Sequence, residues 1–279
     1  MAQEVADALL ECKVGFIGGG KMAQAMAKGF ISSKILKASN VLASARTEET
    51  LSKWTDIGSH GTRDNCRVVQ ECDIVFLCVK PYLLGKLLEE IKHVVTEKQL
   101  FVSVAAGVPL EFMEEALPKG SRIVRTIPNT PCLVQSGVIA YTPGGCCTST
   151  DVKVVHHLLS SVASAENVPE PQIDIISSLC GSSVAWFYMM IEGASDGAVK
   201  VGLPRKLATE LAARAMVGAG NMVLKTGKHP GELKDEVTSP AGSTIVGIHS
   251  LERDGMRGSF MSAVEAAFLR NKEMNPKSK

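Results

Sequence analysis

The stretch "KVGFIGGGKMAQAMAKGF", residues 13–30, joins a short apolar run to a helical pattern through three glycines. Gly18, Gly20 and Ala23 match the G-x-G-x-x-G/A pattern of dinucleotide-binding loops. The first glycine permits a tight turn, the second lets a pyrophosphate approach the backbone, and the small third residue lets helix and strand pack closely. The helix N-terminus would supply N–H groups to the pyrophosphate. The stretch predicts a dinucleotide site; the alternative is a glycine-rich turn that binds nothing.

Strand-like and helical patterns alternate through the first part of the chain. "DIVFLCV" (73–79) is a continuous apolar run, which is typical of a strand that is buried on both faces. Similar runs occur at 13–17, 40–44, 100–105, 121–126 and 137–142. This alternation predicts a parallel sheet covered by helices, a Rossmann-like dinucleotide-binding domain over residues 1–170.

The chain changes character after Pro171. Between Ile173 and Leu224 the sequence is rich in Ala, Gly, Ser and Met and has almost no strand-like pattern. Helices that are apolar on nearly all sides must be buried on nearly all sides, which roughly 110 residues cannot arrange alone. We therefore expect an α/β chain whose second part, residues 171–279, is an all-α dimerisation domain.

Composition excludes several classes of protein. The formal net charge of +1 gives no electrostatic footprint for nucleic acid or an anionic membrane. The start, "MAQEVADALLECK", lacks a targeting pattern, and no run of 18 apolar residues predicts a membrane span. Eight cysteines without C-x-x-C spacing and six histidines without an H-E-x-x-H pattern predict neither a disulfide scaffold nor a metal site. We expect a cytoplasmic protein.

The end of the second predicted strand bears on the choice of dinucleotide. An NAD site has an acidic residue there, which binds the ribose 2′-OH. Here "LASART" (42–47) supplies Ser44 and Arg46, and the first carboxylate is Glu48. A hydroxyl and a guanidinium suit a 2′-phosphate, which favours NADPH over NADH. The alternative is that Arg46 is a solvated charge at a helix start.

Two later loops follow strands at the edge where such folds bind ligands. They are "CVKP" (78–81) and "VAAGV" (104–108). Small residues there would let the flat nicotinamide ring lie against the backbone. Lys80 could equally be an ordinary surface lysine. The residues expected on this side are Val79, Lys80, Pro81, Ala105, Ala106 and Gly107.

Near the C-terminus, "TSPAGST" (238–244) has four hydroxyls, a proline and no charge. Pro240 suits the first turn of a helix, which would leave the N–H groups of Gly242, Ser243 and Thr244 free to bind an anion. The alternative is a plain helix start with Ser239 as N-cap and Pro240 at the first helical position.

Several motifs together carry a resemblance to a known family. They are "GFIGGGKMA" (15–23), "VKP" (79–81), "AAGV" (105–108), "IPNTP" (127–131), "GLP" (202–204) and "HPGELKDEVTSPAGSTIVGIHSLE" (229–252). On them the chain resembles pyrroline-5-carboxylate reductase, the last enzyme of proline biosynthesis, from the glycine loop almost to the C-terminus. Its two ends look like those of the shorter, cytosolic type of animal isozyme.

The resemblance implies hydride transfer from NAD(P)H to the C=N carbon of 1-pyrroline-5-carboxylate, giving L-proline. It also implies an interleaved homodimer, and such dimers commonly form decamers. The implied cofactor residues are Gly18, Gly19, Gly20, Lys21, Met22, Ser44, Asn65, Val79, Lys80, Pro81, Ala105, Ala106 and Gly107. The implied substrate residues are Glu170, Ser239, Gly242, Ser243 and Thr244.

Thr244 is the expected catalytic residue, because its hydroxyl would be available to the ring nitrogen. An unassisted threonine is a feeble acid, so we expect it to position the substrate more than to donate a proton. The chain departs from the family at two places. "LCGSSVA" (179–185) has Ser183 and Val184 where the family usually has glycine and proline, a difference that bears on the size of the pocket. Ala241 replaces a glycine and restricts the backbone.

Two other functions use a similar fold. The 3-hydroxyacid dehydrogenase type has a catalytic lysine on its long helix, whereas residues 181–199 of this chain contain none. A non-catalytic NADP(H)-binding sensor would bind the cofactor without turnover, and it leaves "TSPAGST" unexplained.

Overall fold

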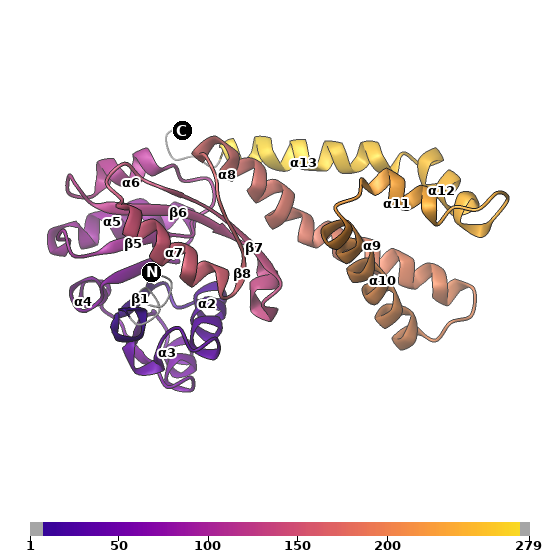
Figure 1. Cartoon of the computed structure of the whole chain (residues 1–279). Helices are drawn as coiled ribbons and strands as arrows, with labels where there is room; N and C mark the ends of the chain where they lie inside the picture. Colours follow the sequence, from indigo (N-terminus) through magenta and orange to yellow (C-terminus); the bar gives the residue numbers. More distant parts are fainter. Residues whose placement is uncertain (1–7, 274–279) are drawn as a thin grey trace. The chain divides into compact units, whose positions relative to one another are not determined.

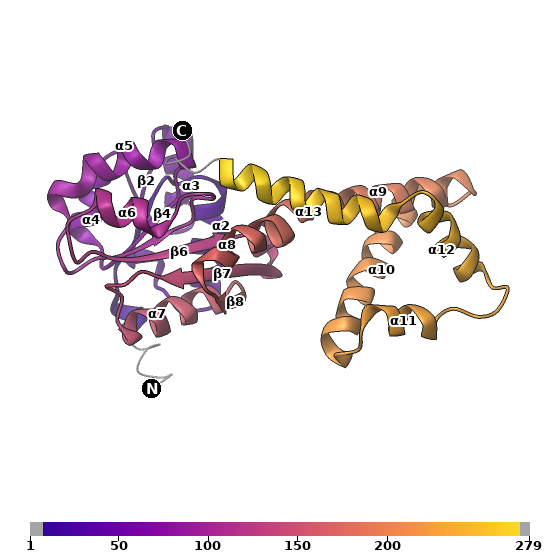
Figure 2. The ribbon, with the colours of Figure 1, turned by 90° about the horizontal axis from the view of Figure 1, so that it is seen from above.

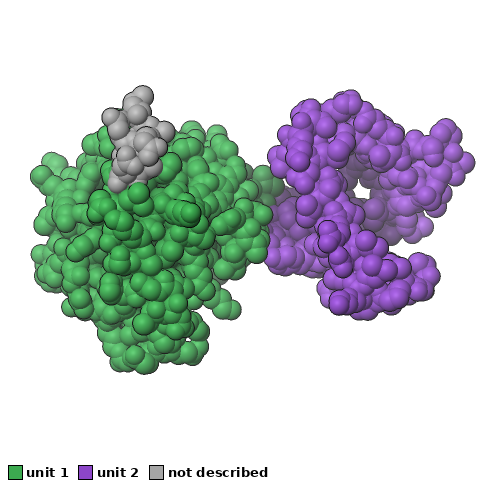
Figure 3. Space-filling model, turned by 60° about the horizontal axis from the view of Figure 1, so that its bottom comes forward, with its two compact units in different colours: residues 1–181, 267–279 green, residues 182–266 purple. Residues whose placement is uncertain are grey.

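The structure is a computed structural model that describes residues 8–273. It divides into two compact units, shown in two colours in Figure 3. The first unit holds the chain up to Gly181 and from Ala267 onward, and the second holds Ser182–Ala266. The first unit therefore includes the far end of the last helix as well as the predicted dinucleotide domain.

The first unit is built on an eight-stranded sheet in the order β3-β2-β1-β4-β5-β6-β7-β8. Neighbouring strands run parallel except β6 and β7, which are antiparallel. The strands are β1 (Val14–Ile17), β2 (Val41–Ser44), β3 (His60–Thr62), β4 (Ile74–Leu77), β5 (Leu100–Ser103), β6 (Arg122–Pro128), β7 (Gly137–Pro143) and β8 (Ala163–Asn167). The parallel α/β prediction is confirmed as far as β6.

The antiparallel pairing of β6 and β7 differs from the expected all-parallel sheet. Only residues 129–136 join the two strands, including the short turn η3 (Thr130–Val134). A parallel connection needs a crossover of a dozen or more residues, so this link can only turn the chain back. β3 and β8 were not expected either, because their sequences, "HGT" and "ASAEN", lack an apolar pattern.

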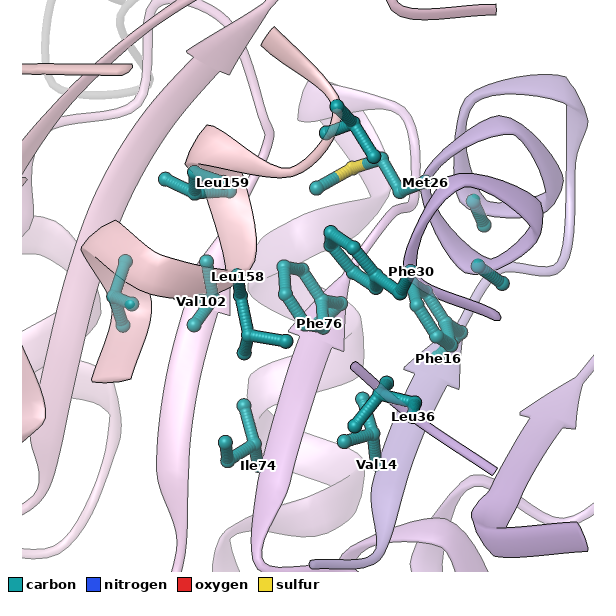
Figure 4. Packing of buried hydrophobic residues seen from close by; sticks show 14 of the residues in the cluster. Val14, Phe16, Met26, Phe30, Leu36, Ile74, Phe76, Val102, Leu158 and Leu159 are labelled. Carbon is teal, nitrogen blue, oxygen red and sulfur yellow. The ribbon is translucent and has the colours of Figure 1, made fainter. Parts of the chain in front are cut away.

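Helices cover both faces of the sheet, with α4, α5 and α6 on one side and α7 on the other (Figure 2). Phe16 and Phe76 stack with their ring centroids 4.9 Å apart, beneath Met26 and Phe30 of α2 and Leu158 of α7 (Figure 4). These helices are α2 (Lys21–Ser32), α3 (Glu48–Thr55), α4 (Asn65–Glu71), α5 (Pro81–Ile91), α6 (Leu110–Ala116) and α7 (Ser149–Ser160), with turns η1 (Ala38–Asn40) and η2 (Lys92–Val94).

The rest of the described chain is helical, as expected (Figure 1). A helical stretch leaves the sheet as α8 (Glu170–Ile176), passes through the π-helical turn η4 (Ser177–Ser182) and continues as α9 (Ser183–Lys200). The other helices are α10 (Arg205–Thr226), α11 (Pro230–Glu236), α12 (Ser243–Arg253) and α13 (Met256–Glu273). By length and composition alone, Glu170–Lys200 is long and apolar enough to cross a membrane, a test that core helices of soluble proteins also pass.

The second unit has no apolar core of its own. Among its described residues, Ala208 is the one buried apolar side chain. Large apolar side chains are exposed on its helices, including Tyr188, Met189, Val217 and Met261. Burial of such surface stabilises a fold by about 25 cal/mol per Å², so these helices need a partner surface.

We therefore expect the stability of the protein to depend on its concentration. If a second copy covers the helical unit, unfolding includes dissociation, and a hundredfold rise in concentration stabilises the folded state by about 2.7 kcal/mol. Calorimetry across that range, with the mass measured by light scattering, tests this expectation. A monomeric mass with a constant unfolding midpoint would contradict it.

Candidate functional site

The glycine loop lies between β1 and α2, and its first two glycines have no room for a side chain. Gly18 has a φ of 93°, and a Cβ on it would lie 2.8 Å from the Cys78 carbonyl oxygen. A Cβ on Gly19 would lie 2.5 Å from Trp54 Nε1. A Cβ on Gly20, in contrast, would have no neighbour within 4 Å. The loop is therefore packed on its inner side and open at Gly20, as close approach of a pyrophosphate requires.

Side chains from α2 and α3 hold this loop in place. Trp54 Nε1 donates to the Gly19 carbonyl at 3.1 Å, and Gln24 Nε2 donates to the same oxygen at 2.8 Å. Gly20 is the N-cap of α2 and provides no side-chain cap, so the first N–H groups of the helix are open to an anion. Trp54 was not among the predicted site residues, although it stands out as a single tryptophan in a largely polar helix.

The end of β2 brings together two predicted cofactor residues. Ser44 is buried, and its hydroxyl donates to Asn65 Oδ1 at 2.6 Å. Asn65 Nδ2 in turn donates to Glu90 at 3.0 Å. Arg46 is exposed, and none of the ion pairs recorded for residues 8–273 involves it. This leaves its guanidinium available to a 2′-phosphate.

A second arginine lies at the same edge, and sequence analysis missed it. Arg63 follows β3, whose last residue Thr62 pairs with Ser44 of β2. Its guanidinium contacts Glu48 at 3.1 Å, and both side chains are exposed. Arg63 was not predicted at this edge because β3, the strand that precedes it, was not predicted.

The nicotinamide-side loops lie next to each other because of the strand register. β1, β4 and β5 are adjacent and parallel, with Ile17 beside Leu77 and Leu77 beside Ser103. The loops after these strands, including 79–81 and 105–107, therefore leave the sheet at one edge. Lys80 is exposed, and Gly107 has a φ of 72°.

A hollow of about 210 Å³ lies at the opposite edge of the sheet. Lys13, Val41 and His60, which line it, stand at the starts of strands. Parallel α/β sheets bind ligands at the carboxyl ends of their strands, so this hollow is not the cofactor site.

Glu170 is held inside the first unit. Its carboxylate accepts from the Leu110 backbone N–H at 2.7 Å and from Arg125 Nη1 at 3.0 Å. The same guanidinium contacts Asp174 at 2.5 Å, and the Arg125 side chain is 3% exposed. The carboxylate thus fastens α8 to β6. The role of Glu170 in binding substrate stays a prediction.

The "TSPAGST" stretch begins its helix later than expected. α12 starts at Ser243 with Gly242 as N-cap, so Pro240 is not its first helical residue and Ser239 is not its cap. Residues 239–242 form a turn instead, in which the Gly242 N–H donates to the Ser239 carbonyl at 3.1 Å.

This turn changes which N–H groups could bind an anion. The Gly242 N–H is already bonded, so the free donors of the first helical turn are those of Ser243, Thr244 and Ile245. No side chain caps this helix, and the Thr244 side chain is exposed. The geometry supports an anion site at this helix N-terminus with a hydroxyl beside it.

The buried thiols near the strands of the first unit are not activated nucleophiles. All eight are free thiols. Burial and the neighbouring carboxylates Glu71 and Asp73 raise the pKa of the Cys72 thiol to about 12. Burial likewise raises the pKa of Cys78, beside the glycine loop. These thiols stay protonated near neutral pH.

Comparison with known proteins covers nearly the whole chain. Residues 170–274 match the model for pyrroline-5-carboxylate reductase dimerisation, and residues 13–107 match that for coenzyme F420-dependent NADP oxidoreductase. Pyrroline-5-carboxylate reductase of Methanosarcina acetivorans is 44% identical over 95% of this chain and 98% of its own length. Pyrroline-5-carboxylate reductase 3 of Rattus norvegicus is 42% identical over 95% and 97%.

A solved structure agrees with these relatives. The pyrroline carboxylate reductase of Plasmodium falciparum, with NADP bound, has a TM-score of 0.87 and 32% identity, covering 95% of this chain and 99% of that one. The helical unit is accordingly a dimerisation domain, and the chain belongs to the pyrroline-5-carboxylate reductase family.

Proposed function

We propose that the chain reduces 1-pyrroline-5-carboxylate to L-proline with NADPH, the final step of proline biosynthesis. The observation that carries the proposal is the uncapped N-terminus of α12 with Thr244 beside it, in a chain that matches a pyrroline-5-carboxylate reductase over 95% of its length. A cyclic imine with one carboxylate needs an anion site and a hydrogen bond near its nitrogen, and this helix start offers both.

The first unit binds the cofactor, whose nicotinamide supplies the hydride. The open side of Gly20 and the first N–H groups of α2 receive the pyrophosphate. Ser44 and Arg46, with Arg63 close by, receive the 2′-phosphate. The loops 79–81 and 105–107 hold the nicotinamide against the backbone. NADH fits the same loop but leaves Arg46 without an anionic partner.

The second unit binds the substrate. The N–H groups of Ser243 and Thr244 hold its carboxylate at the positive end of α12. The Thr244 hydroxyl bonds to the ring nitrogen and fixes the orientation of the imine. Such positioning is a major catalytic effect, because hydride transfer needs the reacting atoms about 3–3.5 Å apart.

The assembly goes beyond a dimer, and the enzyme acts in the cytoplasm. The apolar side chains on α9, α10, α12 and α13 support contacts with further copies. Dimers that share such surfaces form a decamer in this proposal. The match of residues 170–274 to the dimerisation family supports the dimer but does not bear on the decamer.

The activity is tested directly by NADPH oxidation with 1-pyrroline-5-carboxylate, and Thr244→Ala tests the site. Loss of this hydrogen bond should lower kcat about 10- to 100-fold while the Kd of NADPH stays unchanged. Thr226→Ala, which removes an exposed hydroxyl from α10, is the control and should retain full activity. NADPH binding without turnover by the wild type would indicate a sensor. An unaltered rate for Thr244→Ala would refute the role of Thr244.

Arg46→Ala should weaken NADPH binding about tenfold and leave NADH binding nearly unchanged, because only NADPH carries the 2′-phosphate. Fluorescence titration with both cofactors measures the two affinities. Arg67→Ala is the matched control, since Arg67 is exposed and pairs with Glu71 away from the site. Equal losses for NADPH and NADH would contradict the assignment.

The turn before α12 holds an alanine in the left-handed region, with Ala241 at a φ of 58°. A non-glycine residue there costs about 1–2 kcal/mol, and glycine loses about 0.5–1 kcal/mol in chain entropy. Ala241→Gly should therefore stabilise the protein by about 0.5–1 kcal/mol. Denaturant unfolding at fixed protein concentration measures this. Ala215→Gly inside α10 should destabilise it by about 1 kcal/mol, and similar losses for both variants would contradict strain at Ala241.

A further inference from the structure

Three buried polar side chains of the first unit hold the segment where the chain passes into the second. Arg125 pairs with Glu170 and Asp174 of α8. Asn271 of α13 donates to Ser178 Oγ at 3.0 Å. Asn129, just after β6, donates through Nδ2 to the Cys180 carbonyl at 2.9 Å. Arg125, Asn271 and Asn129 are all at most 8% exposed.

The Asn129 amide has a defined orientation. Its Oδ1 accepts from the Val138 backbone N–H at 2.9 Å while its Nδ2 donates to Cys180. A flipped amide would lose both bonds, since a nitrogen cannot accept and an oxygen cannot donate. Asn129 therefore ties β7 and the turn η3 to the π-helical turn η4.

The Cys180 carbonyl lies in the unusual part of this helix. η4 (Ser177–Ser182) is π-helical, and α9 continues from it at Ser183. A π register directs each N–H to the carbonyl five residues back, and an α register to the carbonyl four residues back. In an α register, the Val184 N–H would bond to the Cys180 carbonyl along the helix axis, and so would compete with Asn129 for the direction in which this carbonyl points.

Val184 makes this competition possible. A proline at this position would have no N–H and could not take the α-register bond. In this chain the side chain of Asn129 opposes that bond instead. A change from π to α register would turn the following helix by about 100° and move it by about 1.5 Å.

Asn129 also lies at the edge where the cofactor loops end. β6 is parallel to β5, with Arg125 beside Ser103, and the Thr126 hydroxyl donates to the Ser103 carbonyl at 3.0 Å. Asn129 thus follows the strand next to the one that carries residues 105–107. The Cys180 carbonyl of η4 is thus fixed to the sheet at the edge where residues 105–107 leave it.

We propose that Asn129 is a positioning residue for hydride transfer, because its bond to the Cys180 carbonyl keeps η4 in the π register. This inference rests on the proposed reductase function. The register of η4 sets how α9 leaves the first unit, and α9 leads into the unit that carries Thr244. Loss of the bond would displace the reacting atoms without altering the cofactor loops.

The test compares Asn129→Asp with Asn129→Asp/Val184→Pro in the NADPH oxidation assay. Aspartate keeps the acceptor for Val138 and removes the donor to Cys180. We expect kcat to fall at least about 100-fold, because a shift of about 1.5 Å exceeds the misplacement of about 1 Å that already costs about 100-fold, with the Kd of NADPH unchanged. The primary isotope effect with NADPH deuterated at the transferred position should rise. Val184→Pro should restore most of kcat in the double variant, because it removes the competing N–H.

Asn271→Asp is the matched control, since this buried amide contacts the same segment but not Cys180. It should lower the unfolding midpoint, leave the isotope effect unchanged and gain nothing from Val184→Pro. Unchanged kcat and isotope effect in Asn129→Asp, or no rescue by Val184→Pro, would overturn the inference. If Asn129→Asp does not fold, Asn129→Ala is measured in the same way. An inactive wild type would instead refute the reductase function.

Discussion

The absence of room for side chains at Gly18 and Gly19 fixes the position of the cofactor edge. The backbone of this loop bonds to the Ser44 carbonyl and packs against the end of β4 and Trp54. Trp54 also contacts Phe16, with ring centroids 5.3 Å apart, so the loop is continuous with the apolar core. The N–H groups of α2 that are proposed to bind the pyrophosphate are therefore supported by the buried core of the first unit.

The second unit obeys a different constraint. Its helices expose large apolar side chains, and its polar contacts, such as that between Ser195 and Thr209 at 2.9 Å, are at most partly buried. Stability must come from surfaces shared with another copy. In the proposed function the N-terminus of α12 on this unit binds the substrate, so substrate binding would depend on that association.

Much of this was predictable from residues. The apolar runs that became β1, β2, β4 and β5 are buried on both faces, and such strands carry a strong signal. β3 and β8 lie at the edges of the sheet, where polar residues are tolerated, so they carried almost none. The start of α12 was misplaced because Pro240 suits both a first helical turn and a tight turn. Backbone hydrogen bonds select the tight turn, and such bonds cannot be read from the sequence.

The anchor at Asn129 shows why contacts of this kind escape sequence analysis. Asn129 stands in the "IPNTP" motif, which reads as a proline-bounded loop. Cys180 lies 51 residues away and contributes only its carbonyl, a group that every residue has. Neither position alone carries a signal for the bond. The bond matters because it holds a π-helical turn whose register the N–H of Val184 opposes. The constraint therefore involves three segments, namely the loop after β6, the turn η4 and the start of α9. The N–H at position 184 thus decides whether a side chain elsewhere must hold the helix in its π register.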